Sequence, residues 1–561
     1  MKIRLSAIAL MIACTASAAA AQDFLQPRVT MSSVQWPTAA YDVGDGPTDE
    51  IFAMLNADTN TRFAGIERST VPVLLPMDVA AFRKDKADLN ADAAASNKYF
   101  GEFSPSKFFH AGPAGYDATF WINPREYGIK STWPKPVEVE IGGAAFVYDL
   151  QDPNHQEVFP PPKESGLAEK FPGIRRILRE NHVRYAFERF GVPYVVSIQC
   201  YDRRPSAKIV ACREADELAI RFLKRLTVAG GTPTGNLPEP KLDLARPEHK
   251  SDFTYYGPGN LIPNSGWRKN PGREDYTVYA RLRFPFAQAP AYIKSQAFLH
   301  WGDCYRTGIV GRKGRKDASY HCKVNDKPLV FNEAHPENWS YPWRDNFCEW
   351  RDFLVGQCPG GYGHQAQDMR PSNCVLSNEG ADRCLPYQHA IAAAADGPIW
   401  RSPGYLAAFL FLNTANERVR VSYLHMNPTL MDNDGLVSGR AVSAGEILGK
   451  VSNWGDHEHG TSYHLHFSMQ VFTRSGWVWV NPYMTLVASY ERLTEGRGTE
   501  IKPGDPEPVI PDKKPVILNP APVPAVAATP DSDRPKPAAK PARHKPKKKK
   551  VRRRSKRADA D

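Results

Sequence analysis

Alternating apolar and polar positions predict β-strands over much of the chain. Residues 137–141 and 144–148 are strand-like, and residues 192–198 form a short apolar run typical of a buried strand. Residues 405–413 and 418–425 are two further strand-like runs separated by a polar turn, which predicts a hairpin. By alternation, His425 should share a face with the apolar side chains of its strand.

Two other stretches are predicted to be helical. Apolar residues recur on one helical face over residues 212–226, with charged residues off that face. A helix is also expected over residues 172–190, ended by Gly191, because glycine readily takes the left-handed cap conformation. Helix, strand and helix together predict an α/β (α+β) N-terminal domain. Its role stays open between packing or spacing, substrate binding and autoinhibition.

The first residues resemble a secretory signal in composition. Lys2 and Arg4 precede an apolar stretch, and three alanines up to Ala21 offer a small-residue cleavage site. This predicts a periplasmic or secreted protein. The competing interpretation is a lipoprotein signal cut before Cys14.

The last residues are rich in Pro, Lys and Arg, which predicts a disordered tail. Residues 534–561 carry a net charge of +12, whereas the whole chain carries +11, so the rest is nearly neutral. In an exported protein this run favours anionic wall polymers, lipopolysaccharide or a membrane surface as partners over nucleic acid. A solubilising tail is the alternative.

Composition also predicts the boundaries between these parts. A Gly- and Pro-rich linker follows the N-terminal domain, and an aromatic, cysteine-containing extension precedes the last ordered domain. The predicted divisions are signal peptide 1–21, N-terminal domain 22–229, linker 230–252, extension 253–355, C-terminal β-rich domain 356–497 and tail 498–561.

Cysteine usage agrees with export. Removing Cys14 with the signal leaves eight of the nine cysteines, and an even number in an exported chain predicts disulfides. Their clustering in sequential twos suggests the pairs Cys200–Cys212, Cys304–Cys322, Cys348–Cys358 and Cys374–Cys384. The alternative is that these cysteines bind zinc, but no C-x-x-C pair supports it.

Candidate metal chemistry lies in two short segments. His464 and His466 are two apart, so a strand would project both imidazoles from one face. One hundred residues upstream, His364 and Asp368 offer an imidazole and a carboxylate four apart. Two nitrogens and one oxygen, with a fourth position left for water, are typical of a catalytic zinc site.

Three motifs resemble those of the lysostaphin-type (LytM-like) zinc endopeptidases. They are Gly-His-Gln-Ala-Gln-Asp at 363–368, Tyr-Leu-His at 423–425 and His-Leu-His-Phe at 464–467. The resemblance covers roughly residues 356–486. It implies an antiparallel-sheet peptidase domain with a metal groove, and cleavage of peptide cross-links in bacterial peptidoglycan.

By the same resemblance, His364, Asp368 and His466 would bind one zinc ion per chain. His464 would act as the catalytic base, and His425 would hydrogen-bond the attacking water or the developing oxyanion. His457 and His459 are expected to be loop residues near the groove rather than ligands.

The sequence departs from the family pattern at Ala366, where glycine is usual, and at Ser462 and Tyr463, which replace Gly-Pro. Two alternative functions remain open. One is a metal-free activator of wall amidases, against which retention of all five polar residues argues. The other is a zinc protease that acts on exported proteins.

Overall fold

The computed structural model describes part of the chain. The described residues are 24–87, 97–128, 135–150, 157–159, 166–200, 210–234, 239–262, 265–266, 271–295, 303–310, 316–324, 327–328, 332–351, 353–377, 383–401, 408–413, 417–455 and 457–506. Only the backbone is described at 86–87, 157–159, 303–310, 316–324, 327–328 and 408–413. All of these belong to one compact unit, Met1–Ile517. The predicted signal peptide and the tail beyond residue 506 lie outside the described residues.

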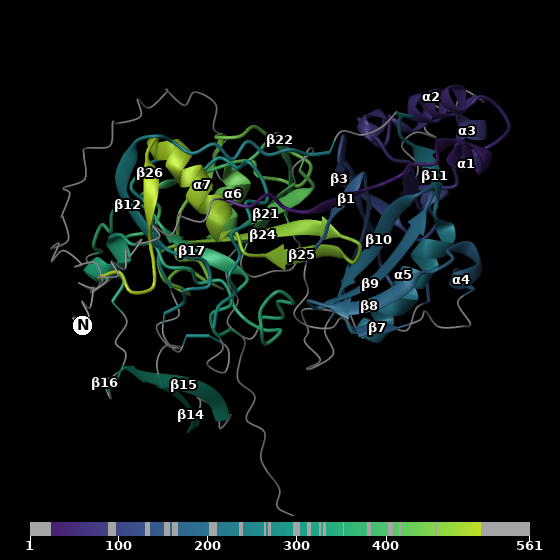
Figure 1. Ribbon diagram of the computed structural model, residues 1–561. Coiled ribbons are helices and arrows are strands. Elements are labelled where there is room, and N and C mark those ends of the chain that lie inside the picture. The colour runs from purple at the N-terminus through teal and green to yellow at the C-terminus, as the bar shows by residue number, and fades with distance from the viewer. Residues whose placement is uncertain are drawn as a thin grey trace, which may run out of the picture. The chain divides into compact units, whose positions relative to one another are not determined.

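A seven-stranded antiparallel sheet forms the centre of the N-terminal part, in the order β3-β4-β5-β10-β9-β8-β7 (Figure 1). Its strands are β3 Ser104–Gly112, β4 Gly115–Ile122, β5 Val137–Ala144, β7 Glu157–Phe159, β8 Arg175–Arg179, β9 His182–Arg189 and β10 Val192–Gln199. The strands predicted at 137–141 and 192–198 are therefore confirmed. The run at 144–148 ends in β6 Phe146–Tyr148, which pairs with β1 Val29–Met31.

The helices of this part include the one predicted over residues 212–226. It is α5 Cys212–Arg225, and it buries its apolar face against β9 and β10. The other elements here are α1 Trp36–Tyr41, α2 Thr48–Thr59, α3 Val79–Ala87, α4 Leu167–Lys170, the 3-10 turns Ile66–Arg68 and Lys98–Phe100, and the paired strands β2 Val73–Leu75 and β11 Thr227–Gly230. Because the main sheet is antiparallel, the arrangement is α+β.

The helix predicted over residues 172–190 is wrong, because this stretch forms the hairpin β8–β9. Ile174, Ile177 and Leu178 lie at helical spacing, but the chain reverses at Glu180 and Asn181. Both residues have positive φ (51° and 59°), as a two-residue hairpin turn requires. Gly191 likewise lies in the turn between β9 and β10 and does not cap a helix.

An eight-stranded sheet, called here the C-terminal sheet, follows the order β13-β17-β24-β21-β20-β19-β22, with β25 also paired to β24. Its strands are β13 Tyr292–Ile293, β17 Ala366–Arg370, β19 Gly397–Arg401, β20 Ala408–Asn413, β21 Val419–Met426, β22 Ala441–Val442, β24 Leu465–Thr473 and β25 Gly476–Val480. The predicted hairpin is confirmed as β20 and β21, which pair antiparallel. The long strand β24 pairs with β21 along one edge and with β17 and then β25 along the other.

The smaller elements of the C-terminal part form separate pairs, turns and helices. They are β12 Lys250–Tyr256 paired with β26 Arg497–Ile501, β18 Ala390–Ala392 paired with β23 Ile447–Lys450, the sheet of β14 Asp303–Val310, β15 Lys316–Val324 and β16 Lys327–Pro328, the 3-10 turn Pro336–Trp339, α6 Pro428–Asn433 and α7 Tyr483–Thr494. Trp343, from the predicted extension, is fully buried and packs against Tyr490 of α7. The described chain is thus β-rich, with several sheets and few helices.

Buried ion pairs join β21 to the N-terminal sheet. Arg418 pairs with Asp117 of β4, and the guanidinium also donates to the carbonyl oxygens of Tyr116 and Gly143. Arg420 pairs with Glu140 of β5. Breaking such a pair leaves an uncompensated buried charge, so these contacts anchor one end of a strand that carries a candidate site residue.

Three of the four predicted disulfides are present: Cys200–Cys212, Cys348–Cys358 and Cys374–Cys384. Cys304 and Cys322 are directly opposite each other in the β14–β15 register, but their side chains lie outside the described residues, so this pairing stays a prediction. Disulfides agree with an extracellular or periplasmic location. Within the described part, the helices are all too short or too polar to cross a bilayer.

Candidate metal centre

The register of the C-terminal sheet places the candidate ligands on one face. Asp368 of β17 lies directly opposite His466 of β24, and directly opposed residues project to the same side of a sheet. Tyr423 and Phe467 project to the other side, where their rings meet edge to face at 5.4 Å. Alternation therefore gives β24 an apolar core face and a face that carries His466. His464, directly before the strand, lies on the same side, since both imidazoles approach Asp368 Oδ1.

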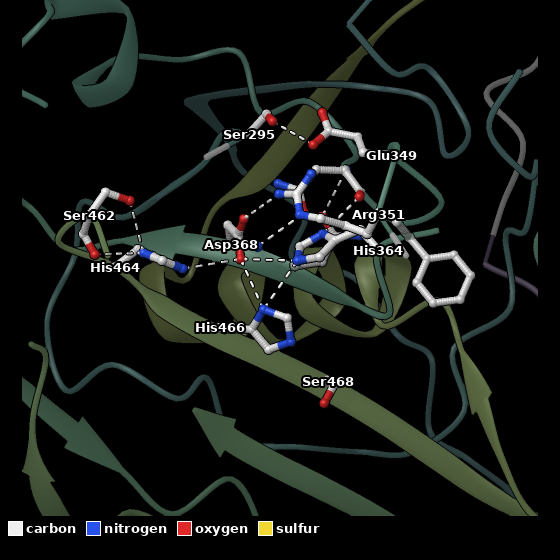
Figure 2. A network of polar contacts seen from close by, with 12 residues as sticks. Ser295, Glu349, Arg351, His364, Asp368, Ser462, His464, His466 and Ser468 are labelled. Carbon is white, nitrogen blue, oxygen red and sulfur yellow. Dashed lines mark hydrogen bonds and ion pairs between the residues drawn. The ribbon is translucent and has the colours of Figure 1, made fainter. Parts of the chain in front are cut away.

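Three donor atoms converge on one point of this face (Figure 2). His364 Nε2 lies 3.1 Å from His466 Nδ1, and each nitrogen lies 3.2 Å from Asp368 Oδ1. A tetrahedral zinc ion with bonds of about 2.0–2.2 Å separates its ligand atoms by roughly 3.3–3.6 Å. The observed spacings are close to that range, so a small rearrangement would let the three atoms share one ion.

Hydrogen bonds on the far side of two imidazoles orient the rings. His364 Nδ1 donates to the Asn346 carbonyl oxygen at 2.9 Å, and His464 Nδ1 donates to the Ser462 carbonyl oxygen at 2.8 Å. With the proton on Nδ1, the Nε2 of each neutral ring carries a lone pair. Both Nε2 atoms face Asp368 Oδ1, at 3.2 and 3.4 Å.

This arrangement fits a cation. Asp368 Oδ1 is buried and has no hydrogen-bond partner. The His364 and His464 Nε2 atoms that face it carry lone pairs in the neutral rings, so they do not donate to it. A buried anionic oxygen without a partner costs free energy, because it has lost its hydration. A metal ion between these donors would remove that cost. The donor set of two imidazoles and one carboxylate suits zinc.

Burial and neighbouring charge favour the metal-binding protonation states. His364, Asp368, His464 and His466 are each at most 3% exposed. Burial lowers the pKa of His466 to about 4 and holds the pKa of His425 well below its usual value. Burial alone would raise the pKa of Asp368, but protonation of the adjacent His364 and His464 imidazoles would outweigh burial and hold it well below the usual range. Neutral imidazole and ionised carboxylate are the ligand forms.

The position of His425 differs from the sequence-based expectation. Its ring lies 4.6 Å from the His464 ring and 5.8 Å from the His466 ring, between centroids, so it does not point to the apolar face with Tyr423. The reason is a φ of +69° at His425, which interrupts the alternation at the end of β21. A positive φ is uncommon in non-glycine residues, and residues of this kind occur in turns and cluster at active sites.

The loop histidines lie outside both candidate metal-ligand groups. Among the described residues, the groups that could hold a metal are His364 with Asp368 and His466, and His425 with His464 and His466. Asn453 Nδ2 donates a hydrogen bond to His459 Nδ1 at 3.0 Å.

Sequence patterns did not predict a second set of site residues, at 345–351. Asn346 accepts from His364 and from the Asp368 amide, and Arg351 pairs with Asp368. No spacing rule marks them, because they precede the family-like region and reach the ligands only through the fold.

Comparisons with known proteins found only distant structural likeness. No family model and no curated protein matches the chain. Solved structures that resemble it include a chain described as a glycyl-glycine endopeptidase LytM from Ruminococcus gnavus, with 18% identity, 24% of this chain and 48% of that chain covered, and a TM-score of 0.17. Lysostaphin from Staphylococcus simulans gives 18% identity, 28% and 54% coverage, and a TM-score of 0.18. Csd3 from Helicobacter pylori gives 20% identity, 31% and 40% coverage, and a TM-score of 0.16. This chain thus spans about half the length of these structures, or less.

Proposed function

We propose that the protein is a zinc-dependent metalloendopeptidase that cleaves peptide cross-links in bacterial cell-wall peptidoglycan. The observation that carries the proposal is the convergence of His364 Nε2, His466 Nδ1 and Asp368 Oδ1, with an unsatisfied buried carboxylate oxygen at its centre. Three such ligands leave a fourth position open, as catalytic zinc sites do.

In this proposal a bound zinc ion would polarise the scissile carbonyl and lower the pKa of the attacking water from ~15.7 towards ~7. His464 supplies the proton chemistry. Its Nδ1–H is held by the Ser462 carbonyl oxygen, so Nε2 can accept a proton from the water and return it to the leaving amine.

His425 lies beside His464, and a backbone carbonyl oxygen likewise accepts from its Nδ1. Its Nδ1 donates to the Trp454 carbonyl oxygen at 2.8 Å, which leaves Nε2 as an acceptor in the neutral ring. A neutral His425 can therefore accept a hydrogen bond from the attacking water, whereas it can stabilise an oxyanion only after it gains a proton. Of the two roles that the family resemblance predicts for His425, orienting the attacking water therefore needs no protonation of the ring, whereas binding the oxyanion does.

The substrate class rests on two sequence features together. The three motifs at 363–368, 423–425 and 464–467 resemble those of wall-cleaving endopeptidases, and residues 1–21 resemble a secretory signal. An exported enzyme with this chemistry meets peptidoglycan peptides in its own compartment.

The test is digestion of purified sacculi by the mature protein, followed by muropeptide analysis. New peptide ends at cross-links, abolished by chelation and restored by zinc, are the expected result. If the protein binds zinc but cleaves only exported proteins, exported proteins rather than peptidoglycan are its substrates. Carefully purified protein that contains no zinc, and gains no activity when zinc is added, would overturn the enzyme proposal.

A further inference from the structure

Residues 345–351 lie alongside the first ligand segment, residues 363–368. We call residues 345–351 the ligand brace. The Cys348–Cys358 disulfide joins the brace to the chain just before the ligand segment. The brace belongs to the predicted extension, and no site role was expected for it.

The brace holds the backbone of His364. The His364 amide donates to the Glu349 carbonyl oxygen at 2.7 Å, and the Cys348 amide donates to the His364 carbonyl oxygen at 2.9 Å. The approach is so close that a Cβ on Gly363 would lie 2.7 Å from the Cys348 Cα, so only glycine fits there. The first ligand is therefore positioned by the brace before β17 begins.

Asn346 of the brace reaches both ligands of the segment. Its carbonyl oxygen accepts from His364 Nδ1 at 2.9 Å, and its Oδ1 accepts from the Asp368 amide at 3.0 Å. The backbone amide of Asn346 donates to Gln367 Oε1 at 3.1 Å. Contacts of this kind fix the tautomer and orientation of a metal ligand.

Arg351 ends the brace at the Asp368 carboxylate. Its Nη2 lies 3.7 Å from Asp368 Oδ2, the oxygen that does not face the imidazole nitrogens. Its Nη1 donates to the Trp350 carbonyl oxygen at 2.9 Å, which limits where the guanidinium can move. Figure 2 shows Arg351 beside Asp368 and Glu349. The side chain is 17% exposed and the Asp368 side chain 2%, so solvent screens this ion pair weakly.

We propose that Arg351 is a positioning residue of the metal centre, which holds Asp368 Oδ2 so that Oδ1 faces the point where His364 and His466 converge. The inference rests on the proposed zinc function. Its physical basis is that a carboxylate rotates about its last bond, so either oxygen could otherwise turn to the metal. An ion pair to one oxygen selects the other as the ligand atom.

The test uses Arg351→Gln, which removes the charge, and Arg351→Lys, which keeps it without the planar fork. Arg344→Gln is the matched control, since the Arg344 guanidinium donates to Asn260 and Leu261 instead. Zinc affinity is measured by chelator competition. The absorption bands of the cobalt-substituted protein report the ligand geometry, and the melting temperature of metal-free protein reports folding.

We expect Arg351→Gln to weaken zinc binding by ~10–100-fold, the usual cost of losing an outer-sphere partner, and to change the cobalt bands. Arg351→Lys should fold like the wild type, lose less affinity and still shift the cobalt bands. Arg344→Gln should match the wild type in both measurements.

Wild-type zinc affinity and wild-type cobalt bands in Arg351→Gln would overturn the inference and leave the zinc proposal intact. An equal loss of zinc affinity in Arg344→Gln would also overturn it, because the effect would then be one of folding. If Arg351→Gln fails to fold, unchanged cobalt bands in Arg351→Lys decide against the inference. Wild-type protein that binds no zinc would overturn the proposed function itself.

Discussion

The two segments that carry the candidate ligands are held in place by different means. Strand β24, which carries His466 and begins one residue after His464, lies inside the C-terminal sheet and pairs along both edges. His364 precedes β17, and the ligand brace bonds both its backbone and its imidazole. One half of the site therefore depends on sheet pairing and the other on contacts from a neighbouring segment closed by a disulfide.

The two parts of this candidate metal site therefore depend differently on sequence: one on backbone pairing, the other on particular side chains. A ladder of backbone hydrogen bonds forms with almost any side chains, so β24 presents the His466 imidazole wherever the sheet forms. His464, one residue before the strand, makes a single bridge to Ser452. The position of His364 depends instead on particular groups, among them Asn346, Gly363 and the Cys348–Cys358 disulfide. Perturbation of the brace should therefore affect metal binding more than it affects the sheet.

The largest effect is expected from removing a ligand in either half. His364→Ala and His466→Ala should both lose zinc and all measurable hydrolysis, because two remaining ligands hold the ion poorly. Elemental analysis after exhaustive dialysis, with muropeptide release as the second measurement, checks this. Retention of zinc by one variant would show that its histidine is not a ligand.

A large but selective effect is expected at His464, two residues before His466. His464→Ala should keep zinc and lose turnover by ~10²–10⁴-fold, because its proposed role is proton transfer. The comparison with His466→Ala separates base from ligand on a shared backbone. Equal zinc loss in the two variants would mean that the roles within the pair are assigned wrongly.

The brace can be loosened without touching a ligand. Replacing Cys348 and Cys358 by serine should weaken zinc binding about 10-fold, by analogy with the loss of outer-sphere support. Replacing Cys374 and Cys384 is the matched control, since both disulfides span 10 residues. Both changes should cost stability of about 2–4 kcal/mol. Chelator competition and thermal melts distinguish the two effects, and equal zinc affinities in the two double variants would contradict a special role of the brace.

The smallest effect on the site is expected from deleting residues 534–561. Hydrolysis of a small soluble cross-linked peptide and zinc affinity should hardly change, because the deletion touches neither ligand segment. Binding to sacculi or anionic vesicles should weaken, and binding of the intact protein should fall steeply with salt, since the screening length shortens to ~3 Å at 1 M. Co-sedimentation across a salt series measures this. Salt-insensitive binding that survives the deletion would move wall binding to another part of the chain.

Local patterns predicted elements well where one physical signal dominated. The apolar face over 212–226 predicted α5, the short apolar run at 192–198 predicted β10, and strand-like runs predicted β5 and the β20–β21 hairpin. The stretch 172–190 failed because Ile174, Ile177 and Leu178 lie at helical spacing by coincidence. The stretch forms a hairpin because Glu180 and Asn181 have positive φ, which reverses the chain and cannot continue a right-handed helix.

The sequence by itself determined which side chains could form a metal site, because strand periodicity puts His464 and His466 on one face and the motif spacing pairs His364 with Asp368. Only the tertiary structure decided how these groups meet. The β17–β24 register placed Asp368 opposite His466, and a left-handed backbone at His425 turned its ring towards His464. The brace supplied Asn346 and Arg351 from outside the motifs. Periodicity is a property of consecutive residues, whereas register, backbone strain and outer-sphere contacts arise only when distant segments pack together.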